Sequence, residues 1–345
     1  MRRNLFIVIF LIGVLLIGFL AYNVHYTETE SPQERISEAT SSDMFSSQSS
    51  SSNEIPAGGN YSLEELMKSR PDYFGFGLYS KPSYPDGIFK KAVHKINGSF
   101  SGYILLANAK GNDYIVFVLL DYQEVPFYLN GTLNLTHHIV LGDMEYRFFR
   151  FEIPNISEGW HDVFVGVFPN PYSAEEQDPH ILYGFRLQLI SGKPTLELPS
   201  FERPLVCTRN NTELDAYLLL TKMACDNTVW YKASMNPLNE DSAFSYFAVV
   251  GNTQDNLQTF ALVQLLDYRQ VSIGNRTVYF GYLYRNEVVS IPLTIKMPKN
   301  GTHRLVLLYF AYPYEPLEYP PGVENTNLRF INEQSNVLFV HVGGP

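Results

Sequence analysis

Residues 113–132, DYIVFVLLDYQEVPFYLNGT, recur in altered form at 259–277, TFALVQLLDYRQVSIGNRT. Both stretches contain the tetrapeptide Leu-Leu-Asp-Tyr, which begins at Leu119 in the first and at Leu265 in the second. Each tetrapeptide follows a run of apolar and aromatic residues and precedes a polar turn. The pattern predicts one buried β-strand and its following hairpin, present twice in the chain.

A second pair of blocks recurs in the same order. IPNISEGWHDVFVGVFPNPY at 153–172 matches MPKNGTHRLVLLYFAYPY at 297–314, with Gly159 opposite Gly301. Two separated blocks in one order indicate a duplicated domain. The passage from Ile-Pro through Gly-x-His into an alternating strand resembles the late strands of bacterial or archaeal immunoglobulin-like domains. The resemblance implies a sandwich fold for each copy.

The alternation within the first block predicts how its strand is placed. Tyr114, Val116 and Val118 alternate with Ile115 and Phe117, so that both faces of the strand are apolar. Such a strand lies centrally in a sheet, with one face in the core and the other partly covered. Short strands and turn signals without a helical period predict an all-β fold of antiparallel β-sandwiches. Together with the duplication, the resemblance implies two tandem immunoglobulin-like antiparallel β-sandwiches.

One short helix precedes the first copy. Ser62 and Glu65 form an S-x-x-E capping box that leads into LEELMKSR, and Pro71 stops the helix. Three prolines and a glycine at 191–204 discourage regular structure and place the boundary between the copies there. We therefore expect one sandwich domain at 61–198 and a second at 199–345.

The N-terminus carries a membrane signal. Leu5–Tyr22 is an apolar run without a charge, and at 1.5 Å per residue it is about long enough to cross a bilayer. Arg2 and Arg3 precede it, so the positive-inside rule sends everything that follows outside. We expect residues 1–26 to be a cytoplasmic stub and an uncleaved signal anchor in contact with membrane lipid through residues 5–22. Cleavage as a signal peptide remains the alternative, and both predict an extracytoplasmic protein.

Residues 27–60 have a different composition. The segment is rich in serine, including SSQSSSS at 46–52, and offers few apolar side chains to offset the entropy of ordering. It is predicted to be a disordered stalk that holds the folded part away from the membrane.

Two further features are typical of an oxidising, external compartment. Cys207 and Cys225 flank a polar turn, and a hairpin that brings them together would allow a disulfide; two buried free thiols are the alternative. Asn-x-Ser/Thr sequons occur more often than chance predicts, although Asn, Gly, Ser and Thr also cluster in β-turns for structural reasons. Besides Asn60, the glycosylation candidates are Asn97, Asn130, Asn134, Asn155, Asn210, Asn275 and Asn300.

Several function classes are disfavoured. The formal net charge of −10 and the lack of a long basic block argue against nucleic acid as a partner. The sequence contains no H-E-x-x-H, C-x-x-C or G-x-S-x-G motif, so we predict no catalytic residue, metal or cofactor. His161 beside Asp162 is explained better by turn geometry than by acid–base chemistry, because its counterpart is followed by an arginine. Asp121 and Asp267 are expected to accept hydrogen bonds from the backbone of the next turn, and a calcium site is the alternative.

The loops that follow the repeated Pro-Tyr dipeptide are the best candidates for binding. Sandwich domains often carry recognition in their end loops, and exposed tyrosines suit a sugar ring or a protein surface. The competing interpretation is that these loops fold back on their own domain. The candidate residues are Tyr172, Glu175, Glu176 and Asp178 in the first loop and Tyr312, Tyr314 and Tyr319 in the second.

Together these patterns predict a single-pass cell-membrane protein whose C-terminal region is extracytoplasmic. Its expected role is non-catalytic: interaction with a protein or carbohydrate ligand, adhesion, or a structural part of the envelope. Two alternatives remain open. One is an extracellular hydrolase that uses carboxylates such as Glu175 and Asp178; the other is a ligand-binding subunit of an envelope complex.

Overall fold

The chain divides into a unit at Met1–Gly59 and a compact unit at Asn60–Pro345, and the structure describes residues of the second unit. The expected membrane anchor, the serine-rich stalk, Asn60 and Asn210 lie outside the described residues. Within the described part, no helix has the length and apolarity to cross a membrane. The computed structural model describes residues 62–89, 91–172, 182–193, 196–208, 218–226, 238–252, 257–317 and 332–343.

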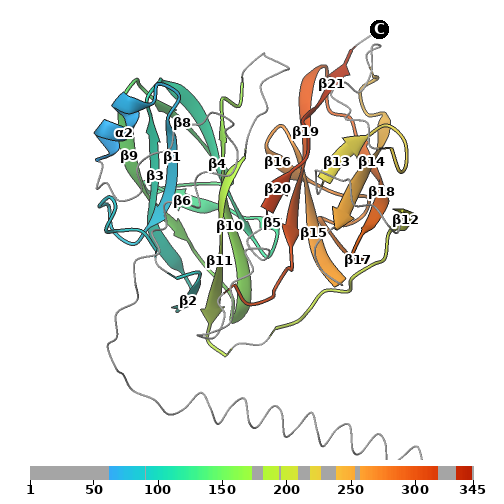
Figure 1. Cartoon of the computed structure of the whole chain (residues 1–345), viewed down its shortest axis with the longest axis horizontal. Helices are drawn as coiled ribbons and strands as arrows, with labels where there is room; N and C mark the ends of the chain where they lie inside the picture. Colours follow the sequence, from blue (N-terminus) through green and yellow to red (C-terminus); the bar gives the residue numbers. More distant parts are fainter. Residues whose placement is uncertain are drawn as a thin grey trace, which may run out of the picture. The chain divides into compact units, whose positions relative to one another are not determined.

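One helix, α2 (Leu63–Ser69), precedes the strands, and the predicted capping box is confirmed. The Ser62 hydroxyl accepts from the backbone N–H of Glu65, and the Glu65 carboxylate accepts from that of Ser62. Leu63 and Met67, one turn apart, are buried on the outer face of the first sheet. The helix therefore covers apolar surface that the sheet would otherwise expose to water (Figure 1).

The strands from β1 to β11 form a first pair of sheets around one core. Every pair of described strands in it runs antiparallel except β2 with β11, which is parallel. The five-stranded sheet has the order β1 (Phe74–Tyr79), β3 (Phe100–Asn108), β9 (Glu145–Ile153), β6 (Phe127–Leu129), β7 (Thr132–Asn134). The six-stranded sheet has the order β2 (Val93–Ile96), β11 (Tyr183–Ser191), β10 (Gly159–Pro169), β4 (Asn112–Leu120), β5 (Gln123–Glu124), and β8 (Thr136–Leu141) also pairs with β4.

The strands from β12 to β21 form a second pair of sheets around a core of their own. The four-stranded sheet has the order β12 (Leu205–Thr208), β18 (Glu287–Lys296), β14 (Ala243–Asn252), β13 (Leu218–Thr221). The six-stranded sheet has the order β16 (Arg269–Val271), β15 (Leu257–Leu266), β19 (Gly301–Ala311), β20 (Asn332–Gln334), with β17 (Val278–Tyr284) also paired with β15 and β21 (Leu338–Val342) with β19.

The apolar alternation of β4 buries both of its faces. Tyr114, Val116 and Val118 lie in the core of the first pair. Ile115 and Phe117, on the opposite face, lie in a separate cluster shared with β15 and β19 of the second pair. The prediction of a central strand covered on both sides is confirmed, and the cover on the second side is the other repeat.

The contacts across this shared cluster are reciprocal. Tyr122 packs on Phe310 at 5.1 Å between ring centroids, and its counterpart Tyr268 packs on Phe168 at 4.8 Å. Phe168 and Phe310 are themselves matched by the alignment of the repeats. The same surface of each repeat therefore meets the other, as the two subunits of a symmetric dimer do.

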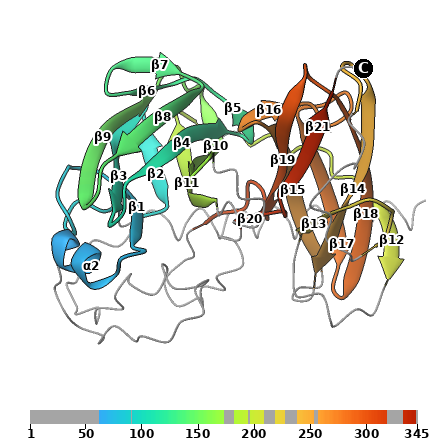
Figure 2. The same ribbon diagram turned by 90° about the horizontal axis from the view of Figure 1, so that it is seen from above.

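Polar contacts between β5 and β16 are also reciprocal. Glu124 donates its backbone N–H to the Gln270 side chain at 2.6 Å, and the backbone N–H of Gln270 donates to the Glu124 carboxylate at 3.3 Å. Arg269 adds an ion pair to the same carboxylate at 2.8 Å. Figure 2 shows β5 and β16, which carry these residues, side by side where the two pairs of sheets meet.

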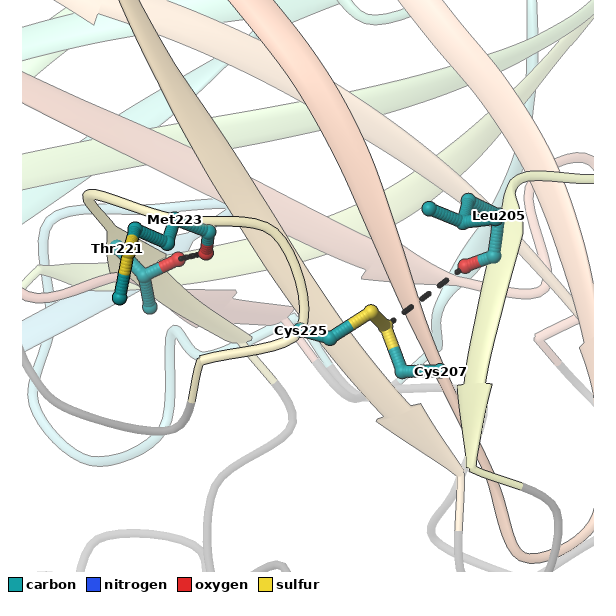
Figure 3. Close-up of a disulfide and its surroundings, with 5 residues drawn as sticks. All are labelled: Leu205, Cys207, Thr221, Met223 and Cys225. Atoms are coloured by element: carbon teal, nitrogen blue, oxygen red, sulfur yellow. Dashed lines mark hydrogen bonds between the residues drawn. A yellow bond between two sulfur atoms is a disulfide. The ribbon is translucent and has the colours of Figure 1, made fainter.

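Cys207 and Cys225 form a disulfide, as predicted, with their Cα atoms 5.4 Å apart. The expected hairpin between them is wrong. Cys207 lies on β12 and Cys225 follows β13, and these strands are the two opposite edges of one four-stranded sheet. Figure 3 shows the segment after Thr221 bending toward β12, with the disulfide spanning the remaining distance from Cys225 to Cys207. The bond therefore closes a loop across the sheet and ties its two edges together.

Replacing both cysteines with serine should lower the free energy of unfolding by about 3 kcal/mol, because a sequence separation of 18 leaves a flexible loop of moderate size in the unfolded chain. Urea unfolding with and without reductant measures the change. Wild-type protein in reductant serves as the control, since it should lose as much stability as the double variant. An equal stability of all three samples would show that the bond constrains nothing.

Candidate functional site

The structure separates the predicted binding tyrosines into two groups. Tyr172 is 60% exposed, as expected, but the expectation of exposure is wrong for Tyr312, which is 7% exposed, and for half-buried Tyr314. Tyr314 sets its ring edge-on to Tyr122 of the first pair of sheets, at 5.5 Å. The segment after β19 thus packs on the other repeat. The remaining candidates, Glu175, Glu176, Asp178 and Tyr319, lie outside the described residues.

A buried ion pair holds this segment in place. Asp162 on β10 and Arg186 on β11 are each 1% exposed and meet at 2.7 Å. The guanidinium also donates to the carbonyls of Ala311 and Tyr312, and the Asp162 carboxylate accepts from the backbone N–H of Tyr314 at 2.8 Å. Because both charges have several partners, their burial is compensated within the protein.

Gln188 extends the network. Its amide nitrogen donates to Asp162 and to the carbonyl of Glu315, both at 2.7 Å, and its amide oxygen accepts from the N–H of Leu317 at 2.9 Å. We call Asp162, Arg186 and Gln188 the polar clamp. The clamp forms hydrogen bonds to the backbone of 311–317. Within this segment Tyr312 adopts a left-handed φ of 49°, which bulky residues rarely adopt.

Tyr122 completes the network from the turn after β4. Its hydroxyl donates to the Asp162 carboxylate and accepts from Arg186 at 2.7 Å. Burial raises the pKa of Tyr122 well above its ordinary value, despite the neighbouring guanidinium. The phenol therefore stays neutral and serves as a hydrogen-bond donor, so the arrangement acts as a structural lock.

The sequence contains a signal for this clamp that the prediction leaves out. Asp162 and Arg186 are charged residues in runs of apolar and aromatic neighbours, HDVFVGVF and LYGFRLQL. A charge inside a strand that is buried on both faces requires a partner. The prediction treats Asp162 only as a neighbour of His161, whose side chain lies on the other face of the strand.

A histidine–aspartate pair recurs in both repeats at the start of the β10 and β19 strands. His161 Nδ1 lies 2.7 Å from Asp121, and its Nε2 lies 3.1 Å from the carbonyl of Ser157. His303 makes the same two contacts, to Asp267 at 2.7 Å and to the Lys299 carbonyl at 2.8 Å. In each repeat, both ring nitrogens of the histidine therefore face hydrogen-bond acceptors.

The role of these aspartates differs in one respect from the prediction. Asp121 accepts the backbone N–H of Asp162, and Asp267 that of Arg304, so each carboxylate binds the neighbouring strand and not the next turn. Each aspartate has a positive φ and stands beside a tyrosine that also has one, which makes a two-residue hairpin turn. The recurrence of the pair is explained by this turn geometry.

Tyr172 borders a surface hollow of about 410 Å³ where β4 begins and where β8 and β10 end. His138 meets the Tyr172 ring edge-on at 5.4 Å and pairs with Asp113 at 3.2 Å. The hollow combines an aromatic ring, a carboxylate and amide groups. Its lining residues are Gly111, Asn112, Asp113, Val140, Leu141, Asn170 and Tyr172.

Two further findings bear on the predicted chemistry. Among the described residues, no three His, Cys, Asp or Glu side chains come together as a metal site would require. All the sequon asparagines that the structure describes are exposed, which leaves each of them accessible to modification. They are Asn97, Asn130, Asn134, Asn155, Asn275 and Asn300.

Comparison of the sequence with protein families and with curated proteins finds no match. Solved structures show distant likenesses. One is the CARDB domain of a Pyrococcus furiosus protein in complex with di-metal ions, 13% identical, covering 35% of this chain and 97% of that domain with a TM-score of 0.21. Another is red sea bream transglutaminase, 12% identical, covering 84% of this chain and 34% of the enzyme with a TM-score of 0.21. A third is dimeric latent PorU from Porphyromonas gingivalis, 11% identical, covering 81% of this chain and 21% of that protein with a TM-score of 0.19. The chain spans well under two thirds of the last two, and likenesses this remote carry no functional argument.

Arg186→Met should lower the free energy of unfolding by about 3–5 kcal/mol, because it leaves the Asp162 charge buried without its cation. Adding Asp162→Asn to that variant should recover part of the loss by removing the charge. Urea unfolding measures both. Arg276→Met is the matched control: its ion pair with Glu202 is about half exposed, and its loss should be below about 1 kcal/mol. Similar losses for Arg186→Met and the control would refute the clamp.

His161→Gln tests the histidine pair through pH. The hydrogen bond that His161 Nδ1 donates to the Asp121 carboxylate raises the pKa of His161 above its ordinary value in the folded protein, against the effect of partial burial. The contribution of His161 to stability is therefore complete below about pH 6.5 and is lost as pH rises through the higher folded-state pKa.

The variant should cost about 1.5–3 kcal/mol at pH 6, as for a charge-assisted hydrogen bond, and less at pH 8.5. Urea unfolding at the two pH values measures the difference. His303→Gln is the control in the other repeat, where Asp267 is 47% exposed, and it should cost less. A difference between wild type and His161→Gln that grows with pH would contradict the assignment.

Proposed function

We propose that the chain is a membrane-anchored extracytoplasmic protein with two tandem immunoglobulin-like sandwiches. In this proposal the Leu5–Tyr22 segment anchors the protein, the serine-rich segment acts as a tether, and the folded unit is a rigid, non-catalytic interaction body. Duplication of one ancestral domain accounts for the matched sequence blocks and for the reciprocal contacts of Tyr122 and Tyr268.

The disulfide between Cys207 and Cys225 carries the proposal of location. Structural disulfides persist in oxidising compartments and are rare in the cytosol. The exposed sequon asparagines fit the same environment, because an acceptor must be reached by the modifying enzyme.

The shared apolar cluster and the polar clamp support the proposal of a rigid body. Tandem domains with small polar contacts bend at their linker, whereas a large apolar interface keeps their relative orientation. Here both faces of β4 are buried, one in each cluster, and Arg186 binds carbonyls of the other repeat. A body of this kind presents its end loops and open faces at a constant spacing. The hydrolase alternative depends on Glu175 and Asp178, and no observation on the described residues favours it.

A topology experiment tests the proposal. A peptide tag placed after Pro345 should be removed when protease is added to intact cells, because the proposal puts the C-terminus outside. A tag before Met1 should survive as the internal control, and its retention on the membrane would also distinguish an anchor from a cleaved signal peptide. Mass analysis without reductant should show Cys207 linked to Cys225. A protected C-terminal tag, or two thiols that alkylate in freshly prepared protein, would refute the proposed location.

A further inference from the structure

One tyrosine occupies equivalent positions in the two repeats, but it is exposed in the first repeat and packed against the other repeat in the second. Tyr172 and Tyr314 end the second repeated block and are matched in sequence. Tyr314 is packed on Tyr122 across the shared cluster, and its backbone is bound by Asp162 of the clamp. Tyr172 is 60% exposed and sets its ring against His138 of its own repeat. The symmetry of the two repeats is broken at this position.

The reason for the difference lies in the clamp. Asp162 is matched in the second repeat by Arg304, whose guanidinium lies over the Phe339 ring at 5.6 Å. The strand beside it carries Phe339 where the first repeat carries Gln188. At the two matched positions, an arginine and a phenylalanine therefore replace the carboxylate and the amide that bind 311–317. That segment has a contact from Tyr268, whose hydroxyl donates to the Pro171 carbonyl at 2.5 Å.

The exposed ring stands at the edge of a polar hollow. Asp113 precedes Ile115 on the same face of β4, beyond the area that the second repeat covers. Val140, opposite Asp113 on β8, is 60% exposed, and His138 orients the Asp113 carboxylate from the same strand. A volume of about 410 Å³ is within the range of roughly 300–1,000 Å³ found for small-ligand sites.

We propose that this hollow, lined by Tyr172, Asp113 and the amides of Asn112 and Asn170, binds a neutral carbohydrate. His138, which contacts both Tyr172 and Asp113, supports the site from outside the lining. A sugar ring has an apolar C–H face that stacks on an aromatic ring, and its hydroxyls donate to a carboxylate and pair with amides. Protein partners need about 800 Å² on each side, which a hollow bordered by one exposed aromatic ring does not supply. The Asp113 carboxylate and the net charge of −10 disfavour acidic sugars.

This inference deepens the proposed function and rests on it, because it assigns a ligand class to the interaction body. The full chain, solubilised in detergent, is applied to an array of neutral hexose and N-acetylhexosamine hexamers, with sialylated and uronic acid oligosaccharides on the same surface. We expect binding to at least one neutral hexamer and none to the acidic set.

Variants assign that binding to the hollow. Tyr172→Ala should weaken the affinity for the bound hexamer at least tenfold, and Asp113→Asn should weaken it by a smaller factor. Tyr172→Phe keeps the stacking ring and should bind nearly as well as wild type. Tyr146→Ala is the matched control, because Tyr146 on β9 is 42% exposed and does not line the hollow. Unchanged melting of each variant shows that the fold is retained.

Several results would overturn the inference. They are no binding to any neutral hexamer, binding that survives Tyr172→Ala, binding that Tyr146→Ala weakens equally, and preference for the acidic oligosaccharides. Any of them obtained with a chain whose C-terminal tag is outside the cell removes the carbohydrate site and leaves the proposed location intact. A tag that is protected from protease refutes the location itself, whatever the array shows.

Discussion

The buried ion pair between Asp162 and Arg186 is the interaction on which the arrangement of the two repeats depends. An apolar interface alone excludes water without fixing a single geometry, because many apolar surfaces pack almost equally well. The Asp162 and Arg186 side chains, each 1% exposed, do fix a geometry, because a buried charge requires partners at hydrogen-bond distance. Arg186 finds two of them, the carbonyls of Ala311 and Tyr312, on the other repeat. Any other relative position of the repeats would keep the Asp162–Arg186 pair, which lies within one repeat, but would leave Arg186 without those two carbonyls.

The shared apolar cluster explains why the repeats associate at all. Ile115, Phe117 and their counterparts from β15 and β19 would be exposed in a single repeat, at a cost of about 25 cal/mol for each Å². Tyr122 packs on Phe310 and Tyr268 packs on Phe168, so equivalent surfaces of the two repeats cover each other. Against this symmetric background, the clamp on one side and the apolar surroundings of Arg304 on the other create the asymmetry that leaves Tyr172 exposed.

The sequence predicted those features that depend on neighbouring residues. The capping box joins Ser62 and Glu65, which are three positions apart. The alternation of apolar residues in β4 can be read from the sequence of that single strand. The pairing of Cys207 with Cys225 was correct, but its geometry was not, because strand order in a sheet is set by contacts distant in sequence. The prediction missed the burial of Tyr312 for the same reason. Arg186, which donates a hydrogen bond to the Tyr312 carbonyl, lies 126 positions earlier in the sequence.

The amino-acid sequence by itself therefore determined an all-β chain with a duplicated unit, a capped helix and one disulfide pair, since periodicity, local hydrogen bonding and cysteine count specify these. Which of two equivalent tyrosines is buried was decided only by the tertiary structure. The physical reason is that burial depends on where the charged and amide groups of distant strands converge, and in this protein Asp162 and Gln188 converge on the segment of Tyr314 and not on that of Tyr172.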